Sequence, residues 1–265
     1  MNGASLLAFG TAGILQLVAC SSTGAASSGT GGGDSPGVTT GSGPTVDAPV
    51  TFETSDGLSL SGVLTTDPAS PPGSPGVVLV HQFGESKAQW AALPHMLAHS
   101  GLRTLAFDLR GHGASDAYGG ASLDDLLTDP DGAPRDVDAA LAYMAGPGGA
   151  DPDRLGVVGT SIGANLALVA AIKHQARAFV SISARRTPTE SLAGVAATGM
   201  RSVFYLASEL DPGGQAADAN ALFLDTLEPR AIAIFPGTAD HGIAILEDQP
   251  GAEDAVRSWL LEQLQ

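Results

Sequence analysis

Six short apolar runs recur along the chain, and stretches with helical spacing of apolar residues separate most of them. Each run is nearly uninterrupted in hydrophobicity, which is typical of strands that are buried on both faces of a sheet. Strands that alternate with helices predict a mainly parallel sheet with helices on both sides. The six runs are Val77–Val80, Thr104–Phe107, Leu155–Val158, Phe179–Ile182, Val203–Ala207 and Ala231–Phe235.

Two further runs, Val50–Thr54 and Leu58–Leu64, flank Asp56-Gly57. That pair favours a tight turn, so the two runs predict an antiparallel hairpin. The fold class is therefore α/β: a doubly wound, mainly parallel sheet of about eight strands, flanked by helices. The predicted helices are Lys87–His99, Asp136–Ala145, Ile162–His174, Gln215–Leu227 and Ala252–Leu264.

Charge and cysteine content exclude several classes of function. The 12 Lys and Arg residues stand against 28 Asp and Glu residues, a net charge of −16, which excludes a nucleic-acid binder that relies on phosphate contacts. Cys20 is the only cysteine, so the chain has no internal disulfide, no thiolate metal site and no second cysteine for catalysis.

The first twenty residues have the pattern of an export signal. Leu6–Ala19 is mostly apolar but short for a membrane span, and it ends in small residues before Cys20. Leu17-Val18-Ala19-Cys20 resembles the lipobox of bacterial lipoproteins, which implies removal of residues 1–19 and lipidation of Cys20. Residues 1–5 carry no Lys or Arg, whereas such signals usually carry one or two.

Residues 20–46 predict a lipidated cysteine followed by a flexible tether, because residues 21–46 are almost all Gly, Ser, Thr, Ala and Pro. The folded domain is expected to cover residues 47–265. The resemblance implies an exported bacterial lipoprotein of the cell envelope, with the lipid bilayer as a partner through Cys20. Ser21, rather than Asp, after the cysteine favours the outer membrane where a cell has two.

A candidate nucleophile lies in Gly159-Thr160-Ser161-Ile162-Gly163, a match to G-x-S-x-G. The string alone is weak evidence, because residues 33–37 in the tether also match it. Context separates the two. Ser161 directly follows a predicted buried strand and opens a predicted helix, which is the sharp turn that exposes a nucleophilic hydroxyl. The alternative is a serine that only caps the helix.

With this motif the chain resembles the α/β-hydrolase family, specifically its serine-esterase and dienelactone-hydrolase-like members, from about Val50 onward. The resemblance also rests on three segments that follow predicted strands: His81-Gln82-Phe83-Gly84-Glu85-Ser86, Phe107-Asp108-Leu109-Arg110-Gly111-His112-Gly113-Ala114-Ser115 and Asp240-His241-Gly242. It implies an acyl-enzyme mechanism that needs no metal and no organic cofactor.

A serine nucleophile needs a neutral imidazole as base and a carboxylate that orients it. The resemblance assigns these roles to His241 and Asp211, which keeps the chain order Ser, Asp, His of this fold. Glu209 is a close rival for the acid, because loop register can shift by two residues. Asp240 is disfavoured, since it is adjacent to His241. The spacing of His95 and His99 suits metal ligands, but a surface position is favoured for both.

The oxyanion of an acyl-transfer intermediate needs preorganised donors. The resemblance supplies the backbone N–H groups of Phe83 and Ile162, and it implies structural roles for His81 and His112. Gln82 stands where many relatives have glycine, and its side-chain amide can instead help to orient the site or the substrate. For Asp108–Ser115 a scaffolding role is favoured over a second functional loop.

The resulting hypothesis is that the protein hydrolyses carboxylic esters or thioesters, with a small-molecule acyl compound as its substrate. Residues 183–202 have room for one helix but not for a lid domain, which favours short or accessible acyl groups. A serine peptidase or amidase with the same triad is the first alternative. The second is a tethered binding module that keeps the fold without the reaction.

Overall fold

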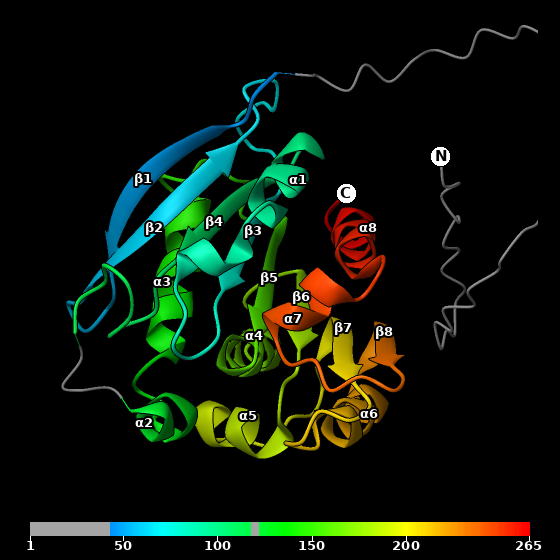
Figure 1. Cartoon of the computed structure of the whole chain (residues 1–265). Helices are drawn as coiled ribbons and strands as arrows, with labels where there is room; N and C mark the ends of the chain where they lie inside the picture. The colour runs from blue at the N-terminus through cyan, green and yellow to red at the C-terminus, as the bar shows by residue number, and fades with distance from the viewer. Residues whose placement is uncertain (1–42, 118–121) are drawn as a thin grey trace, which may run out of the picture.

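The computed structural model describes residues 43–117 and 122–265. One sheet has eight strands in the order β1-β2-β4-β3-β5-β6-β7-β8 (Figure 1). Pairing is antiparallel for β1 with β2 and β2 with β4, and parallel elsewhere, which confirms the predicted fold class. The strands are β1 Val46–Glu53, β2 Ser59–Thr66, β3 Gly76–Val80, β4 Arg103–Phe107, β5 Leu155–Thr160, β6 Ala178–Ile182, β7 Arg201–Ser208 and β8 Leu227–Phe235.

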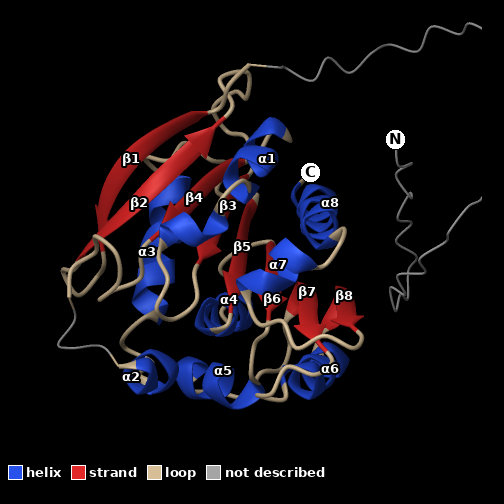
Figure 2. Ribbon diagram, viewed as in Figure 1, coloured by secondary structure: helices blue, strands red, loops and turns tan. Residues whose placement is uncertain are grey.

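Helices cover both faces of the sheet (Figure 2). Helices α3, α4 and α6 pack on one face, and α1 and α8 pack on the other. The helical elements are a 3₁₀ turn η1 at Lys87–Trp90, α1 Leu93–His99, α2 Leu123–Thr128, α3 Pro134–Ala145, α4 Ile162–Ile172, α5 Arg186–Ala193, α6 Gln215–Asp225, α7 Ile243–Asp248 and α8 Ala252–Leu264.

Side chains of the central strands alternate between two hydrophobic cores. In β3, Val78 and Val80 belong to the core under α3 and α4, whereas Val77 and Leu79 belong to the core under α1 and α8. Successive residues of a strand point to opposite faces of the sheet. A strand that is covered on both faces must therefore be apolar at every position, which is the pattern from which the sequence predicted it.

The predicted helix Lys87–His99 is instead two elements, η1 and α1. Ala91 separates them with a φ of 45°. In one continuous helix Pro94 would lack an N–H donor and its ring would clash with the carbonyl of residue 90, whereas near the N-terminus of α1 it leaves no bond unmade. The prediction of a single helix was therefore wrong, and proline is the physical reason for the break.

The start of the first strand also differs from the prediction, because exposed strand residues lack the apolar pattern. The strand predicted at Val50–Thr54 is β1, which begins at Val46, one residue before the predicted start of the domain. Most of its side chains are exposed because it lies at an edge of the sheet, so its first half has no apolar signature. The segment 183–202 contains one helix, α5, as expected, and no large lid domain. The signal, Cys20 and most of the tether lie outside the described residues.

Among the described residues no helix has the length and apolar character that crossing a membrane would require.

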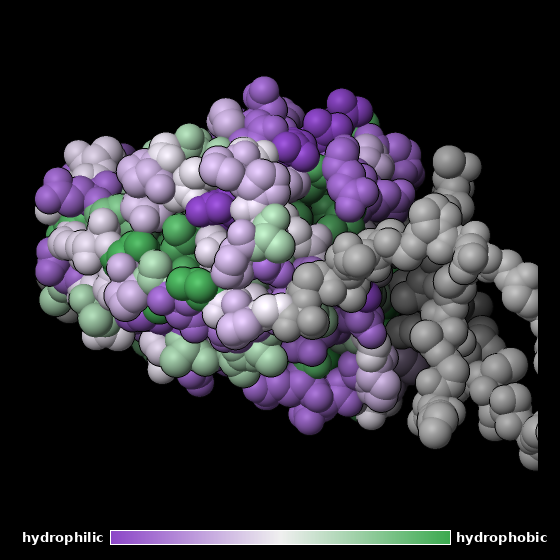
Figure 3. All heavy atoms as spheres, turned by 90° about the horizontal axis from the view of Figure 1, so that it is seen from above, coloured by the Kyte–Doolittle hydropathy of each residue, from purple (hydrophilic) through white to green (hydrophobic). Residues whose placement is uncertain are grey.

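Hydrophilic residues make up most of the face seen in Figure 3, and the hydrophobic patches between them are small. The chain also carries a net charge of −16. A charged surface without large apolar patches stays hydrated and resists association. This face of the domain therefore suits contact with water.

Candidate active site

Ser161 occupies a sharp turn between the end of β5 and the start of α4. Its φ is 53° and its ψ is −112°, a strained backbone for a residue with a side chain. The Ser161 N–H donates to the carbonyl of Ile182 at 2.8 Å, which fixes the turn against β6. Its hydroxyl makes no capping bond to α4, so the alternative of a simple helix cap does not describe this side chain.

The two glycines of the motif have no room for a side chain. A Cβ at Gly159 would lie 2.0 Å from the carbonyl oxygen of Gly163, and a Cβ at Gly163 would lie 2.0 Å from the carbonyl oxygen of Val80. Both obstacles are backbone atoms of the sheet and the helix, which cannot move independently. The motif therefore needs glycine at both positions for steric reasons.

Replacing Gly163 with alanine is expected to lower the free energy of unfolding by about 3 kcal/mol, at the top of the usual range for overpacking. Urea denaturation would measure it. Gly73 is the control for crowding, because it has a φ of 80° but nothing lies within 4 Å of a Cβ added there. Gly73→Ala should cost only about 1 kcal/mol from backbone strain. Equal losses for both variants would contradict the steric argument.

The structure brings Ser161, His241 and Asp211 together at the carboxyl ends of β5, β8 and β7. His241 Nε2 lies 2.9 Å from Ser161 Oγ, and His241 Nδ1 lies 2.7 Å from Asp211 Oδ2. The Asp211 side chain is only 1% exposed, whereas the His241 side chain is 38% exposed. A buried carboxylate thus faces one nitrogen of an imidazole that solvent can reach.

The hydrogen-bond partners determine which nitrogen of His241 carries the proton. The Asp211 carboxylate only accepts, so Nδ1–H donates to it. In the neutral imidazole Nε2 is then an acceptor, and it can accept the Ser161 O–H. This tautomer is the one that a general base for a serine nucleophile requires.

The structure separates the rival acids from His241. Glu209 accepts a hydrogen bond from the Gly237 N–H at 2.8 Å and so joins the loops that follow β7 and β8. Asp240 accepts a hydrogen bond from the Gln249 side chain. Neither carboxylate contacts the imidazole in the described part of the chain, so Asp211 is the carboxylate next to His241.

Two backbone donors lie in the turns proposed for the oxyanion hole. Ile162 is the first residue of α4, and Phe83 lies in the loop after β3. Neither N–H donates a hydrogen bond to another residue within 43–117 or 122–265. Both donors thus remain free for an acceptor that the protein does not supply.

His81 and His112 hold the loop of Phe83 in place. His81 Nδ1 donates to the carbonyl of Gln82 at 2.8 Å, and His81 Nε2 accepts from the Leu109 N–H at 2.9 Å. His112 Nε2 accepts from the Gly84 N–H at 3.4 Å, and the His112 ring meets the Phe83 ring edge to face. These contacts are structural, as the resemblance implies, and they require a neutral His81.

Burial lowers the pKa of His81 to about 4. An unfolded histidine has a pKa of about 6.5, so the unfolded chain takes up the proton first. The contribution of His81 to stability is therefore complete above pH 6.5 and is lost as the pH falls toward 4, by on the order of 3 kcal/mol. Urea denaturation across this range should show that the free energy of unfolding depends less steeply on pH for His81→Gln than for the wild type. Equal slopes for the two proteins would contradict this role of His81.

Sequence reasoning missed Gln215, whose side chain lies next to His241. Gln215 is 6% exposed, and its Nε2 lies 3.5 Å from His241 Nδ1. Its Oε1 is buried and has no hydrogen-bond partner among the described residues. The only sequence signal is its place at the start of α6, four residues after Asp211, which is too general to identify it.

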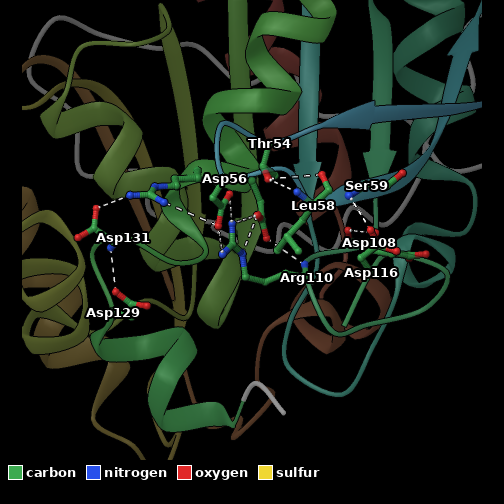
Figure 4. Close-up of polar contacts among 12 residues, drawn as sticks. Thr54, Asp56, Leu58, Ser59, Asp108, Arg110, Asp116, Asp129 and Asp131 are labelled. Atoms are coloured by element: carbon green, nitrogen blue, oxygen red, sulfur yellow. Dashed lines mark hydrogen bonds and ion pairs between the residues drawn. The ribbon is translucent and has the colours of Figure 1, made fainter. Parts of the chain in front are cut away.

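The segment Asp108–Ser115 has a structural role. Arg110 is 1% exposed, and its guanidinium binds Asp136 of α3 at 2.7 Å. It also binds Asp56 of the β1–β2 turn at 3.0 Å (Figure 4). Buried Asp108 accepts from the Lys87 backbone N–H at 2.7 Å and from the Ala114 N–H at 2.9 Å. This segment therefore ties the hairpin, α3 and η1 to the end of β4, as its predicted scaffolding role requires.

His95 and His99 do not share a ligand site. His95 Nδ1 lies 2.7 Å from Thr45 Oγ1, and His99 Nδ1 lies 3.5 Å from Asp67. Within the described residues no group of three or more His, Cys, Asp or Glu side chains could hold a metal ion.

Known proteins resemble the chain in sequence. A protein of Mycobacterium tuberculosis, Rv2307c, is 30% identical over 236 residues, which cover 80% of this chain and 79% of that protein. YfhR of Salmonella typhi is 27% identical over 208 residues, which cover 73% of this chain and 64% of that protein. This chain thus spans less than two thirds of the length of YfhR.

Solved structures share the fold. An esterase of Pyrococcus furiosus, Pf2001, superposes with a TM-score of 0.64 at 18% identity, over 83% of this chain and 94% of that one. A dienelactone hydrolase of Anabaena variabilis superposes with a TM-score of 0.63 at 19% identity, over 84% of this chain and all of that one. A family model for the alpha/beta hydrolase fold matches residues 75–210. The family model covers about half of the chain, so the chain belongs to the alpha/beta hydrolase family.

Proposed function

We propose that this protein is a serine hydrolase that cleaves carboxylic esters or thioesters through an acyl-enzyme. One observation carries the proposal: Ser161 Oγ, the His241 imidazole and the Asp211 carboxylate form one continuous chain of contacts of 2.9 and 2.7 Å. A hydroxyl that is hydrogen-bonded to a neutral, carboxylate-oriented imidazole is an activated nucleophile.

The first half of the reaction forms the acyl-enzyme. Ser161 Oγ attacks the carbonyl carbon of the substrate while its proton passes to His241 Nε2, and Asp211 stabilises the resulting imidazolium. The former carbonyl oxygen, now negatively charged, accepts hydrogen bonds from the N–H groups of Phe83 and Ile162. The carbon–oxygen or carbon–sulfur bond to the leaving group then breaks, and His241 gives that group its proton.

The second half releases the acid. A water molecule gives a proton to His241 Nε2 and attacks the acyl carbon, and the bond to Ser161 Oγ breaks as this oxygen takes the proton back. Every proton transfer uses the same nitrogen, so the reaction needs no further titratable group.

The surroundings of the site favour short or accessible acyl groups. No large lid domain lies between β6 and β7 in the described chain, and the Ser161 side chain is partly exposed. Phe83, whose N–H is a proposed oxyanion donor, is 43% exposed, and Leu210, next to Asp211 in the sequence, is 57% exposed. Their side chains offer apolar surface to an acyl or alcohol group. The esterase and dienelactone hydrolase that share the fold make ester bonds the first class to assay.

Steady-state assays of the purified protein test the proposal. We expect turnover of p-nitrophenyl acetate and butyrate, slower turnover of longer acyl chains, and covalent labelling by a fluorophosphonate. Aminoacyl p-nitroanilides should react far more slowly than the esters. Faster cleavage of the anilides would indicate an amidase instead, and an absence of both turnover and labelling would indicate a binding module.

The export signal, the lipid anchor on Cys20 and a place in the cell envelope, with the outer membrane favoured, are part of the same proposal. They rest on residues 1–46 of the sequence alone. The anchor would hold the hydrolase domain at a membrane surface through the tether.

A further inference from the structure

The side chain of Gln82 crosses from the loop after β3 to the loop that carries His241. Its Oε1 accepts a hydrogen bond from the backbone N–H of Ile243 at 3.1 Å. Of the two ends of a glutamine amide only the oxygen can accept from an N–H, so this contact fixes the orientation of the amide. Gln82 immediately precedes Phe83, the proposed oxyanion donor, and Ile243 lies two residues after His241.

The Gln82 side chain also lies close to Gly242, the residue between His241 and Ile243. Gly242 has a φ of 59°, and a Cβ at this position would lie 2.0 Å from Gln82 Oε1. The Gly242 N–H donates to Ser183 Oγ at 3.0 Å. Two consecutive N–H groups after His241 are thus held by side-chain oxygens from two different loops, one of them from Gln82.

The backbone of Gln82 is fixed in turn by Gln89. The Gln82 N–H donates to Gln89 Oε1 at 3.2 Å, and Gln89 Nε2 donates to Thr160 Oγ1 at 2.9 Å. Thr160 is the residue before Ser161. A chain of three hydrogen bonds therefore links the strand end before the nucleophile, the loop of Phe83 and the loop of His241.

We propose that Gln82 is a positioning residue, whose side-chain oxygen holds the backbone after His241 in register with Phe83 and Ser161. The inference rests on the proposed function. It also gives a reason why this chain has glutamine where many relatives have glycine, because a glycine here would leave the Ile243 N–H without the acceptor that Gln82 supplies. Displacements of about 1 Å at a catalytic group can cost 10²-fold in rate, so a single bond of this kind can matter for kcat.

The variant Gln82→Met tests the inference, because methionine keeps the length of the side chain but removes the acceptor. We expect kcat for p-nitrophenyl acetate to fall about 10- to 100-fold while KM changes less than about twofold. The rate constant for labelling by a fluorophosphonate should fall in parallel, and this readout does not depend on ester preference. Gln82→Glu keeps an oxygen toward Ile243 and should restore kcat to within about threefold of the wild type.

Gln175→Met is the matched control, since Gln175 also makes one side-chain hydrogen bond, to Asp138, but lies before the N-terminal end of β6. Its kcat should equal that of the wild type. If the wild type is active and the Gln82→Met variant has the same kcat, the positioning role of Gln82 would be overturned but the proposed function would stand. Equal losses for Gln82→Met and Gln82→Glu would also overturn it, because the amide nitrogen would then be the group that matters. A wild type that neither turns over esters nor reacts with the probe would overturn the proposed function itself.

Discussion

Replacing Ser161 with alanine is expected to lower kcat for short p-nitrophenyl esters by at least about 10⁴-fold and to abolish fluorophosphonate labelling. The loss is large because the variant has no atom that can form the acyl-enzyme. The His241 imidazole would remain in place but would have no hydroxyl to deprotonate. Any residual hydrolysis would come from water in the same site.

The folded state should barely change in this variant. The Ser161 hydroxyl caps no helix, and its backbone N–H, which holds the turn, is kept in alanine. Urea denaturation should therefore give a free energy of unfolding within about 1 kcal/mol of the wild type. Ser258→Ala, at a partly exposed position of α8, is the matched control and should keep full activity. Labelling of Ser161→Ala at the wild-type rate would show that another residue is the nucleophile.

Replacing Arg110 with methionine is expected to lower the free energy of unfolding by about 3–5 kcal/mol, the usual cost of removing one partner of a buried ion pair. The Asp136 carboxylate is fully buried and would lose the guanidinium that lies 2.7 Å away. Methionine fills most of the space of the arginine stem, so the loss reports on charge more than on volume. Urea denaturation at pH 8 would measure it.

The pH dependence of this loss identifies its cause. Burial raises the pKa of Asp136 even with Arg110 present. Without Arg110 that pKa must rise further, because only the neutral carboxyl group is tolerated there. The destabilisation should thus shrink as the pH falls from 8 to 5, since protonation relieves the buried charge. A loss that is independent of pH would point to packing instead.

Arg135→Met is the control for the ion pair. Arg135 contacts Asp131 at 2.7 Å and Asp56 at 3.7 Å, but its side chain is 34% exposed. Exposed pairs contribute about 0–1 kcal/mol, so this variant should lose no more than that. Comparable losses for Arg110 and Arg135 would contradict the argument from burial.

The sequence was sufficient for the architecture because burial on both faces leaves a local signature. The strands β3 to β7 lie between two helical layers, nearly all their residues are buried, and most of those residues are apolar. The edge strand β1 lacks this signature over its first four residues, because the side chains on both of its faces are exposed there. The short helices α2 and α7 were not predicted, because six residues are too few to display a helical period.

Context along the chain was also sufficient to select Ser161, since a strand before it and a helix after it separate it from the second match in the tether. It could not separate Asp211 from Glu209. The two carboxylates are two residues apart in one loop, and a loop has no fixed period that would orient either of them. Only the packed loop shows Asp211 turned toward His241 and Glu209 turned toward Gly237.

By itself, then, the sequence determined the order of strands and helices, the turn that exposes Ser161 and the residue types of the site, because local periodicity and steric limits on glycine are properties of neighbouring residues. Tertiary structure alone decided which carboxylate meets His241, how Gln82 reaches Ile243 and where Gln215 is buried. These contacts join residues 26 to 161 positions apart, and their geometry depends on how the strand ends and loops pack together.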